Sequence, residues 1–564
     1  MAKKSQSAFL KDITRSVGQV AVDLVNAQRA RQLAEPLRVV QFNLPAAMPA
    51  LPDTRNLIEQ RLFGRSPMSV AEFETALRRL MKHAGHEAII VVMNNLAMAL
   101  ADLQSLRDAL LRYRAAGHRV YAYAQGYDMA SYLLATAADE IWLQPGAPVV
   151  TTGLVQQQVF LKNALDTVGL EADVVAISPY KSAADALSLA EPSAESRAQV
   201  EWLLDSEYEV MLSTMANGRG KTLESVRAMI NTAPHTDAQA LELGYVDHIC
   251  NEEGFAARAG SAPVMWEDAD ARLPLDVRFD QDYVAIVPLT GMIVNGSSAR
   301  PPVDIPVPLV GGERMGDATV VQAIRQLMED DNARAVVLFI DSPGGSATAS
   351  EAIASALDEL ARTRPVVAVM GSVAASGGYY ISTPADWVVA QPLTITGSIG
   401  VVMAKLITNE MLKKLRFNPF YYLRGDNAAM FTPISRFTQD ERDKLREAIT
   451  RIYDVFLQRV ADARKKKVEE IDAIGGGRVW TGAQALEHGL IDQLGGLYEG
   501  LAKARELAGL HAEAPARLFR VKGSKPLPAQ VAEKVDPAAA VNYWYAGVTA
   551  LANGQALYLT PYEL

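Results

Sequence analysis

The chain has few of the residues that build disulfides, metal centres or nucleic-acid surfaces. Its 564 residues include one cysteine, Cys250, which excludes an internal disulfide and a multi-cysteine metal site. Lysine and arginine number 55 against 65 aspartates and glutamates, and the net charge of −10 argues against a general nucleic-acid binder. With 49% hydrophobic and 21% charged residues, the composition is that of a globular protein. The single cysteine fits a reducing compartment.

Long apolar runs are also absent. No stretch of about 18 uninterrupted apolar residues occurs, so we expect no transmembrane anchor. The N-terminus lacks the apolar core and cleavage site of a secretory signal peptide. Its apolar residues recur instead at helical spacing, at Leu10, Ile13, Val17, Val20 and Leu24. This amphipathic helix could lie on a membrane surface or pack against a sister subunit, and we expect a cytoplasmic protein whose only membrane contact is peripheral, on the inner membrane.

Strands and helices are expected to alternate along most of the chain, which predicts an α/β fold of stacked βαβ units. Expected strands include Ala88–Met93, Arg119–Ala124, Ala335–Ile340 and Val366–Val369. The length is too great for one core. We expect an N-terminal helix and connector at 1–50, one domain at 51–260, a second at 261–510 that begins with a linker at 261–275, and a tail at 511–564.

The two predicted domains are copies of one another. Sliding the chain against itself by 247 residues, or by 245 near the end of each half, brings identical residues into register. Matched pairs include Tyr132 and Tyr379, Asp139 and Asp386, Gly153 and Gly400, Thr236 and Thr481, and Asp247 and Asp492. The copies differ where chemistry is expected, because Met129 stands opposite Ser376 and Ala97 and Met98 stand opposite Gly344 and Gly345. The first domain is therefore the degenerate copy.

Ser376 follows a valine-rich predicted strand and precedes Gly377-Gly378. A serine at a strand-to-helix junction projects its hydroxyl at the end of the strand, and the glycines let backbone N–H groups approach a bound carbonyl. Gly344 and Gly345 follow another predicted strand, in a turn suited to holding an oxyanion. Either segment alone could also be an ordinary glycine-rich turn with no ligand.

A serine nucleophile needs a base, and the second domain offers few. No histidine lies between His248 and His488, and no lysine between Lys221 and Lys405. Lys405, Lys413 and Lys414 are expected on an exposed amphipathic helix. Lys181, in the first domain, is the only charge in its stretch, so that burial could lower its pKa and make it a neutral base. The alternative for Lys181 is an ordinary surface charge.

Several motifs together make the chain resemble the long, duplicated form of bacterial signal peptide peptidase A. These enzymes are Ser-Lys proteases of peptidase family S49, within the crotonase/Clp-protease superfamily. The motifs are DSPGGSATASE from Asp341, VAASGGYYISTPAD from Val373, LTITGSIG from Leu393, YKSAAD from Tyr180 and WTGAQALEHGLID from Trp480. The resemblance implies two tandem crotonase/ClpP-like domains. It also implies a homotetramer that cleaves hydrophobic peptides, such as remnant signal peptides, without metal or cofactor.

By the same resemblance, Ser376 is the nucleophile and Lys181 the general base, supplied by the other half of the chain. Ser398 matches the serine that orients the lysine, and Gly344, Gly345 and Gly377 match the oxyanion hole. The long enzymes of this family usually begin with a membrane-spanning anchor, and here only the amphipathic helix is found. Two rival interpretations are a crotonase-like enzyme acting on acyl-CoA, which would leave Ser376 and Lys181 without a role, and an inactive scaffold.

Overall fold

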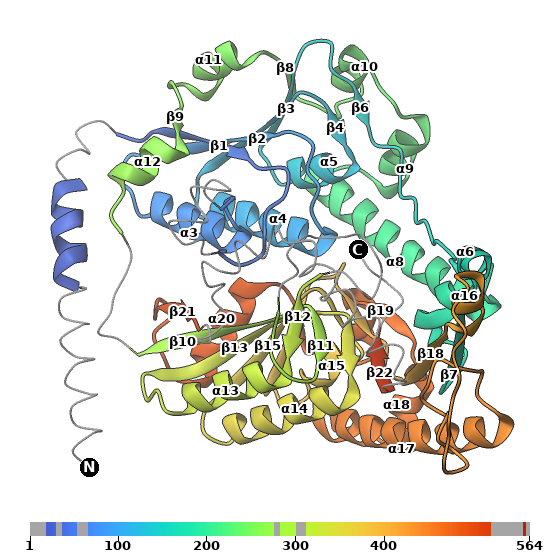
Figure 1. Cartoon of the computed structure of the whole chain (residues 1–564). Helices are drawn as coiled ribbons and strands as arrows, with labels where there is room; N and C mark the ends of the chain where they lie inside the picture. The colour runs from blue at the N-terminus through green and yellow to red at the C-terminus, as the bar shows by residue number, and fades with distance from the viewer. Residues whose placement is uncertain are drawn as a thin grey trace, which may run out of the picture. The chain divides into compact units, whose positions relative to one another are not determined.

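The computed structural model describes residues 19–29, 36–53, 66–275, 282–299, 312–519 and 556–559. It forms two compact units (Figure 1). The first unit comprises residues 1–155 and 207–282, and the second comprises residues 156–206 and 283–564. The segment 156–206, which carries Lys181, thus groups with the unit that contains Ser376. The domain boundaries expected from the sequence stay a prediction.

The first unit is built on a parallel sheet of six strands in the order β8-β5-β3-β2-β1-β9. The strands are β1 (Val39–Leu44), β2 (Ala88–Met93), β3 (Arg119–Ala124), β5 (Glu140–Leu143), β8 (His248–Ile249) and β9 (Val264–Met265). Every residue of β2 is buried, as expected for a parallel strand covered on both faces. Helices α3 (Val70–Met81) and α4 (Leu100–Ala115) pack side by side along one face of this sheet (Figure 1).

The main sheet of the second unit has the order β19-β17-β15-β13-β10-β21, with β16 and β20 branching from β15. The strands are β10 (Tyr283–Thr290), β13 (Ala333–Ser342), β15 (Val366–Ala375), β16 (Trp387–Ala390), β17 (Ile395–Gly397), β19 (Val479–Thr481), β20 (Gln493–Leu494) and β21 (Ala516–Leu518). Helices α13 (Asp317–Met328) and α14 (Ala347–Ala361) lie on one face, and α20 (Leu497–Leu507) lies on the other (Figure 1). Helices therefore cover both faces of this sheet.

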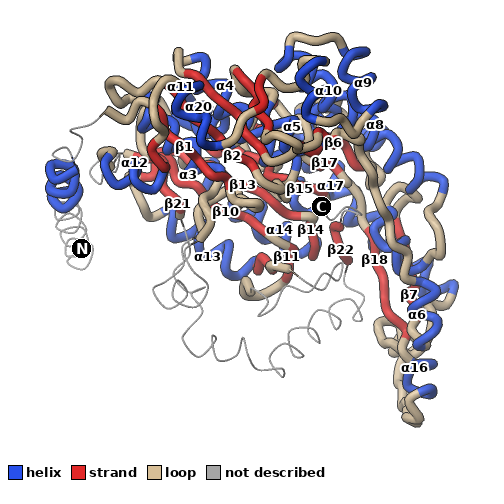
Figure 2. The backbone as a smooth tube through the Cα atoms, turned by 90° about the horizontal axis from the view of Figure 1, so that it is seen from above, coloured by secondary structure: helices blue, strands red, loops and turns tan. Residues whose placement is uncertain are grey.

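A smaller sheet completes the second unit, in the order β12-β11-β14-β22-β18-β7. Its strands are β7 (Glu171–Ala176), β11 (Met292–Val294), β12 (Arg314–Gly316), β14 (Gly344–Ser346), β18 (Val402–Ile407) and β22 (Ala556–Leu559). Seen from above, β22 lies between β14 and β18 (Figure 2). This sheet joins three distant parts of the sequence, because β7, β14 and β22 come from residues 171–176, 344–346 and 556–559.

The predicted strands Ala88–Met93 and Arg119–Ala124 are confirmed without change, as is the α/β class. The strand predicted at Val366–Val369 is longer, since β15 continues to Ala375 by pairing with β13 and then with β17. The expected linker at 261–275 was wrong, because it contains β9 and α12 (Trp266–Arg272). The ring of Trp266 stacks on Phe42 with centroids 4.9 Å apart, which ties this segment to the first unit.

Part of the predicted N-terminal helix can be assessed. Residues 19–29 are helical, and Val20 and Leu24 are exposed. Leu10, Ile13 and Val17 lie outside the described residues. Within the described ranges, no helix is both long and apolar enough to cross a membrane.

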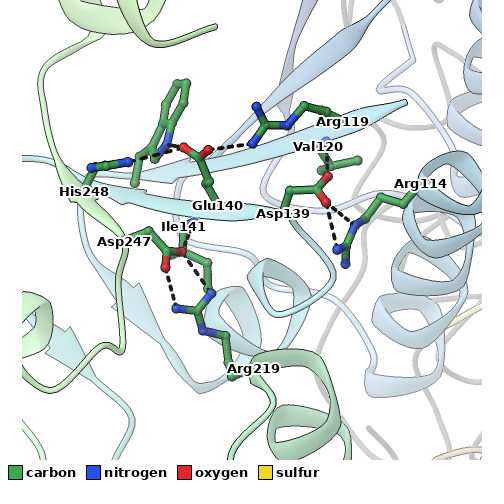
Figure 3. Close-up of polar contacts among 10 residues, drawn as sticks. Arg114, Arg119, Val120, Asp139, Glu140, Ile141, Arg219, Asp247 and His248 are labelled. Atoms are coloured by element: carbon green, nitrogen blue, oxygen red, sulfur yellow. Dashed lines mark hydrogen bonds and ion pairs between the residues drawn. The ribbon is translucent and has the colours of Figure 1, made fainter. Parts of the chain in front are cut away.

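The repeat is preserved in the interactions of the two units. In the first unit, Arg219 forms an ion pair with Asp247, whose carboxylate also accepts the Ile141 N–H at 2.7 Å (Figure 3). In the second unit, Arg464 and Asp492 make the corresponding pair, and Asp492 accepts the Val388 N–H at 2.8 Å. The buried tyrosines match as well, with Tyr132 donating to Tyr245 O at 2.8 Å and Tyr379 to Leu490 O at 2.7 Å. Each unit therefore uses the same set of side chains to anchor the same turns.

Candidate active site

Ser376 stands at the junction between β15 and α15 (Gly377–Tyr380). Its φ of 55° lies in the left-handed region that non-glycine residues rarely adopt, and its N–H donates to Gly397 O at 2.8 Å. Strained serines at strand-to-helix turns are typical of hydrolase nucleophiles. The side chain is fully buried in this structure.

Lys181 reaches this turn because of the pairing between β7 and β18. The two strands are antiparallel, with Ala176 opposite Val402 and Glu171 opposite Ile407. The pairing extends one residue further, since Ile177 N–H donates to Val401 O at 3.0 Å. The chain that follows β7 therefore arrives beside the residues that precede β18, which include Ser398.

The Lys181 Nζ lies within hydrogen-bond distance of three oxygens. It is 2.7 Å from Ser376 Oγ, 2.8 Å from Ser398 O and 2.9 Å from Ser398 Oγ. All three are neutral. The structure thus brings together the three side chains that the sequence singled out, from positions up to 217 residues apart.

Lys181 is 1% exposed, and burial lowers its pKa well below the ordinary value of 10.5. Desolvation penalises the charged ammonium, and the three contacting oxygens carry no formal charge to offset that penalty. A neutral amine has a lone pair that can accept the proton of the Ser376 hydroxyl. The arrangement can therefore activate a serine without a histidine.

A glycine loop at residues 475–477 packs against the backbone of Lys181. A β-carbon on Gly477 would lie 2.7 Å from Lys181 Cα, closer than non-bonded carbons come, and φ at Gly477 is 90°. Ser178 Oγ also donates to Gly476 O. These contacts hold the segment before Lys181 in place, and no pattern in the sequence predicts them.

The predicted oxyanion residues also lie together. A β-carbon on Gly377 would lie 3.2 Å from Gly344 Cα, so the two glycine turns are in contact. Gly344 and Gly345 have φ values of 105° and 150°, which only glycine adopts readily. The Gly344 N–H already donates to Ser342 Oγ at 3.2 Å, and Gly345 lies in β14, which is paired on both sides.

Sequence reasoning missed the residues that hold β15 in position. Asp341 Oδ1 accepts the Val373 N–H at 3.0 Å, where the register between β13 and β15 shifts. Burial raises the pKa of the Asp341 carboxyl. Thr396 Oγ1 donates to Ala374 O at 2.7 Å. The sequence did contain a signal for Asp341, which follows directly on a predicted buried strand. A carboxylate in that position needs hydrogen-bond donors nearby.

The remaining candidate bases lie in other surroundings. The prediction that Lys405 lies on an exposed helix was wrong, because Lys405 lies in β18 and is 2% exposed. Its Nζ donates to Met430 O at 2.9 Å and lies 4.0 Å from the ring centroid of Phe437. Lys413 and Lys414 do lie on a helix, α16 (Asn409–Lys414). His488 follows α19 (Gly482–Glu487) and packs on Trp480.

Two family descriptions match the chain. Peptidase family S49 matches twice, over residues 112–262 and 358–511, and Clp protease matches residues 312–388. The two S49 matches fall in the two copies of the repeat. They support two tandem ClpP/crotonase-like domains.

Three relatives are similar over most of the chain. The chloroplastic serine protease SPPA of Arabidopsis thaliana is 30% identical over 74% of this chain and 62% of its own length. Protease 4 of Haemophilus influenzae is 28% identical over 75% of this chain and 70% of its own length. Protease 4 of Salmonella typhi is 30% identical over 80% of this chain and 75% of its own length. This chain therefore spans less than two thirds of the Arabidopsis protein.

The fold and these matches define the class of protein as a serine protease built on Clp-protease-like domains. Within that class, the chain belongs to peptidase family S49.

Proposed function

We propose that this protein is an endopeptidase with a Ser-Lys dyad, in which Ser376 is the nucleophile and Lys181 the general base. The observation that carries the proposal is the 2.7 Å contact between Lys181 Nζ and Ser376 Oγ in a buried site. Ser398 orients the lysine through its carbonyl and hydroxyl oxygens. The dyad is split in sequence, with Lys181 and Ser376 195 residues apart.

The reaction is acyl transfer. Neutral Lys181 takes the hydroxyl proton as Ser376 Oγ bonds to the scissile carbonyl carbon, and the oxyanion is held by amides of Gly377 and of the Gly344–Gly345 turn. The C–N bond then breaks, and the leaving amine takes the proton from Lys181. Water attacks the acyl-enzyme with Lys181 again as base, which releases the second product and restores Ser376.

Hydrophobic peptides, such as remnant signal peptides, are the proposed substrates. The subunits are proposed to form a homotetramer, and light scattering would measure its mass. The protein is proposed to be cytoplasmic, with peripheral contact to the inner membrane through the N-terminal helix. Val20 and Leu24 support this contact because they are exposed on the described part of that helix, and cell fractionation tests it.

Peptide cleavage tests the proposed chemistry. Casein and an apolar fluorogenic peptide are incubated with the wild-type protein, Ser376→Ala and Lys181→Ala. We expect cleavage by the wild type alone, with losses of about 10⁴-fold or more for Ser376→Ala and about 10²–10⁴-fold for Lys181→Ala. Full activity in Lys181→Ala would overturn the dyad. Binding of acyl-CoA without peptide cleavage would favour a crotonase-like enzyme, and neither activity would favour a scaffold.

A further inference from the structure

One arginine contacts two neighbours of the candidate base. Arg478 directly precedes β19, and its backbone O accepts the Ser398 N–H at 2.7 Å. Its guanidinium carbon lies 4.1 Å from the centroid of the Tyr180 ring, within the range of a cation–π contact. Tyr180 is the residue before Lys181, and Ser398 provides two of the oxygens around the amine. Arg478 therefore contacts the base through residues on either side of it in space and in sequence.

The backbone contact supports an unfavourable conformation at Ser398. Its φ of 52° lies in the left-handed region, which is costly for a residue other than glycine and persists only where the surroundings hold it. Arg478 O binds the Ser398 N–H, and the Gly477 N–H donates to Ile399 O at 2.7 Å. These two hydrogen bonds fix the conformation in which both oxygens of Ser398 face the amine.

The side-chain contact restrains the ring of Tyr180. The guanidinium of Arg478 is itself tethered, because its Nη1 donates to Gly475 O at 3.0 Å. The Tyr180 ring also contacts the ring of Trp202, with centroids 5.8 Å apart. Trp202 is in turn bound to β19, since its Nε1 donates to Val479 O at 3.0 Å. These two contacts of the ring lead back to the segment that contains Arg478.

The arginine is present in only one copy of the repeat. At the offset of 245 used near the end of each half, Ala233 stands opposite Arg478. Arg219 and Arg464 stand opposite one another at the same offset, and each forms the ion pair that anchors its own unit. An arginine of the common framework is thus kept in both copies, whereas Arg478 is found only in the copy that keeps Ser376.

We propose that Arg478 is a positioning residue for the candidate dyad, because its guanidinium holds Tyr180 and its carbonyl holds Ser398. This rests on the proposed roles of Ser376 and Lys181. A general base must lie within hydrogen-bond reach of the proton it takes, and a displacement of about 1 Å can cost about 10²-fold in rate. Substitution of the arginine side chain leaves its backbone contact in place, so the expected loss is smaller.

Fluorophosphonate labelling of Ser376 tests this role, because it yields both a rate constant and a final labelled fraction. Arg478→Met removes the cation and Tyr180→Leu removes the ring. Each should lower the rate constant about tenfold and leave the final labelled fraction at the wild-type value. The double variant should be no slower than the slower single variant, because both substitutions break the same contact. All rates are measured below the thermal transition of every variant.

A conservative variant and a matched control complete the comparison. Tyr180→Phe keeps the ring under the guanidinium and should react within about threefold of the wild-type rate. Arg517→Met removes a guanidinium that lies 4.5 Å from the Tyr283 ring centroid, in β21 at the opposite edge of the sheet from β19. Its rate constant should equal that of the wild type.

Failure of this proposal and failure of the proposed chemistry give different results. If Lys181→Ala is labelled slowly but Arg478→Met and Tyr180→Leu react at the wild-type rate, positioning by Arg478 is overturned and the dyad stands. A smaller labelled fraction at an unchanged rate would also overturn it, since that result reports lost folded protein alone. If the wild type is not labelled at Ser376, or Lys181→Ala reacts at the wild-type rate, the proposed chemistry is wrong and the positioning role falls with it.

Discussion

The surroundings of Lys181 favour its neutral form, because burial lowers the pKa of the amine. Its amine sits among neutral oxygens at 1% exposure, and burial of a charge without a countercharge is among the costliest arrangements in a protein. Such a cost is tolerated where the group is used. A structural lysine would more commonly pair with a carboxylate or extend to solvent.

The pKa of Lys181 predicts a pH dependence of stability. An unfolded lysine has a pKa near 10.5, whereas burial lowers the pKa of the folded group. Between these two values the unfolded chain holds a proton that the folded chain does not, so the folded state gains stability as the pH rises. The free energy of unfolding of the wild type should therefore increase relative to that of Lys181→Met, by about 1.4 kcal/mol per pH unit inside that window.

Urea unfolding of both proteins at several pH values from 6 to 10 measures this difference. Other titrating groups are common to both proteins and cancel. A constant difference across the whole range would show that Lys181 is protonated alike in the folded and unfolded states.

Ser398 offers a second prediction at the scale of one residue. Ser398→Ala removes the hydroxyl at 2.9 Å from Lys181 but leaves the carbonyl at 2.8 Å. We expect kcat to fall about tenfold, a smaller loss than in Lys181→Ala, because one orienting hydrogen bond of about 1.4 kcal/mol is lost. Peptide cleavage under saturating substrate measures it, and a loss as large as that of Lys181→Ala would assign Ser398 a direct part in proton transfer.

At the scale of structural elements, the glycine loop at 475–477 contacts the backbone of Lys181 and fixes its position. Gly477→Ala would place a β-carbon 2.7 Å from Lys181 Cα. Gly425→Ala is its matched control, since Gly425 has a φ of 91° and no atom within 4 Å of the added carbon. Both variants bear the strain of alanine at positive φ, about 1–3 kcal/mol, and only Gly477→Ala displaces the base.

We expect Gly477→Ala to lose about 10²-fold in peptide cleavage, as for a displacement of about 1 Å in an active site, and Gly425→Ala to keep its activity. Thermal unfolding should show a larger destabilisation in Gly477→Ala, whose β-carbon also meets the Lys181 backbone, so both activities are compared at a temperature where both variants are folded. Equal activity in both variants would mean that the loop does not position Lys181.

The elements also show where sequence reasoning succeeded and failed. The apolar runs of β2 and β15 could be recognised locally, because strands buried on both faces are almost entirely hydrophobic. Ser376 and Lys181 could be singled out by the shortage of other bases and by comparison of the repeats. Their contact depends on the pairing of β7 with β18, which no local pattern specifies.

The same pairing explains the wrong environment predicted for Lys405. The segment VMAKLI is short and has no clear period, so helix and strand could not be separated from its sequence. Its six partners in β7, more than 200 residues away, decide that it is a strand and that Lys405 is buried.

In the whole molecule, the two copies kept the same framework and diverged in chemistry. Arg219–Asp247 and Arg464–Asp492 are equivalent ion pairs, one in each unit. Ser376, Lys181 and Ser398 all lie in the second unit as the structure divides it. Duplication therefore left the first unit free to lose the serine and the glycines while retaining its fold.

The division into two units predicts that substitutions at Arg219 and Arg464, the equivalent positions, affect the candidate active site differently. Arg219→Met and Arg464→Met should each cost about 1.5–3 kcal/mol in the unit concerned, because each leaves a carboxylate without its charged partner. Fluorophosphonate labelling of Ser376 is measured during a thermal ramp. Arg464→Met should lower the temperature at which labelling is lost, whereas Arg219→Met should leave that temperature unchanged; the reverse order would contradict the division.

The central claim is that Lys181 activates Ser376, and the rate of fluorophosphonate labelling as a function of pH tests it most directly. For the wild type, the second-order rate constant should rise with pH and reach half its maximum well below pH 10.5, since burial lowers the pKa of Lys181. Ser376→Ala should not be labelled, and Lys181→Ala should react about 10²–10⁴-fold more slowly at neutral pH while unfolding cooperatively. Labelling of Lys181→Ala at the wild-type rate, with the wild-type pH profile, would contradict the account.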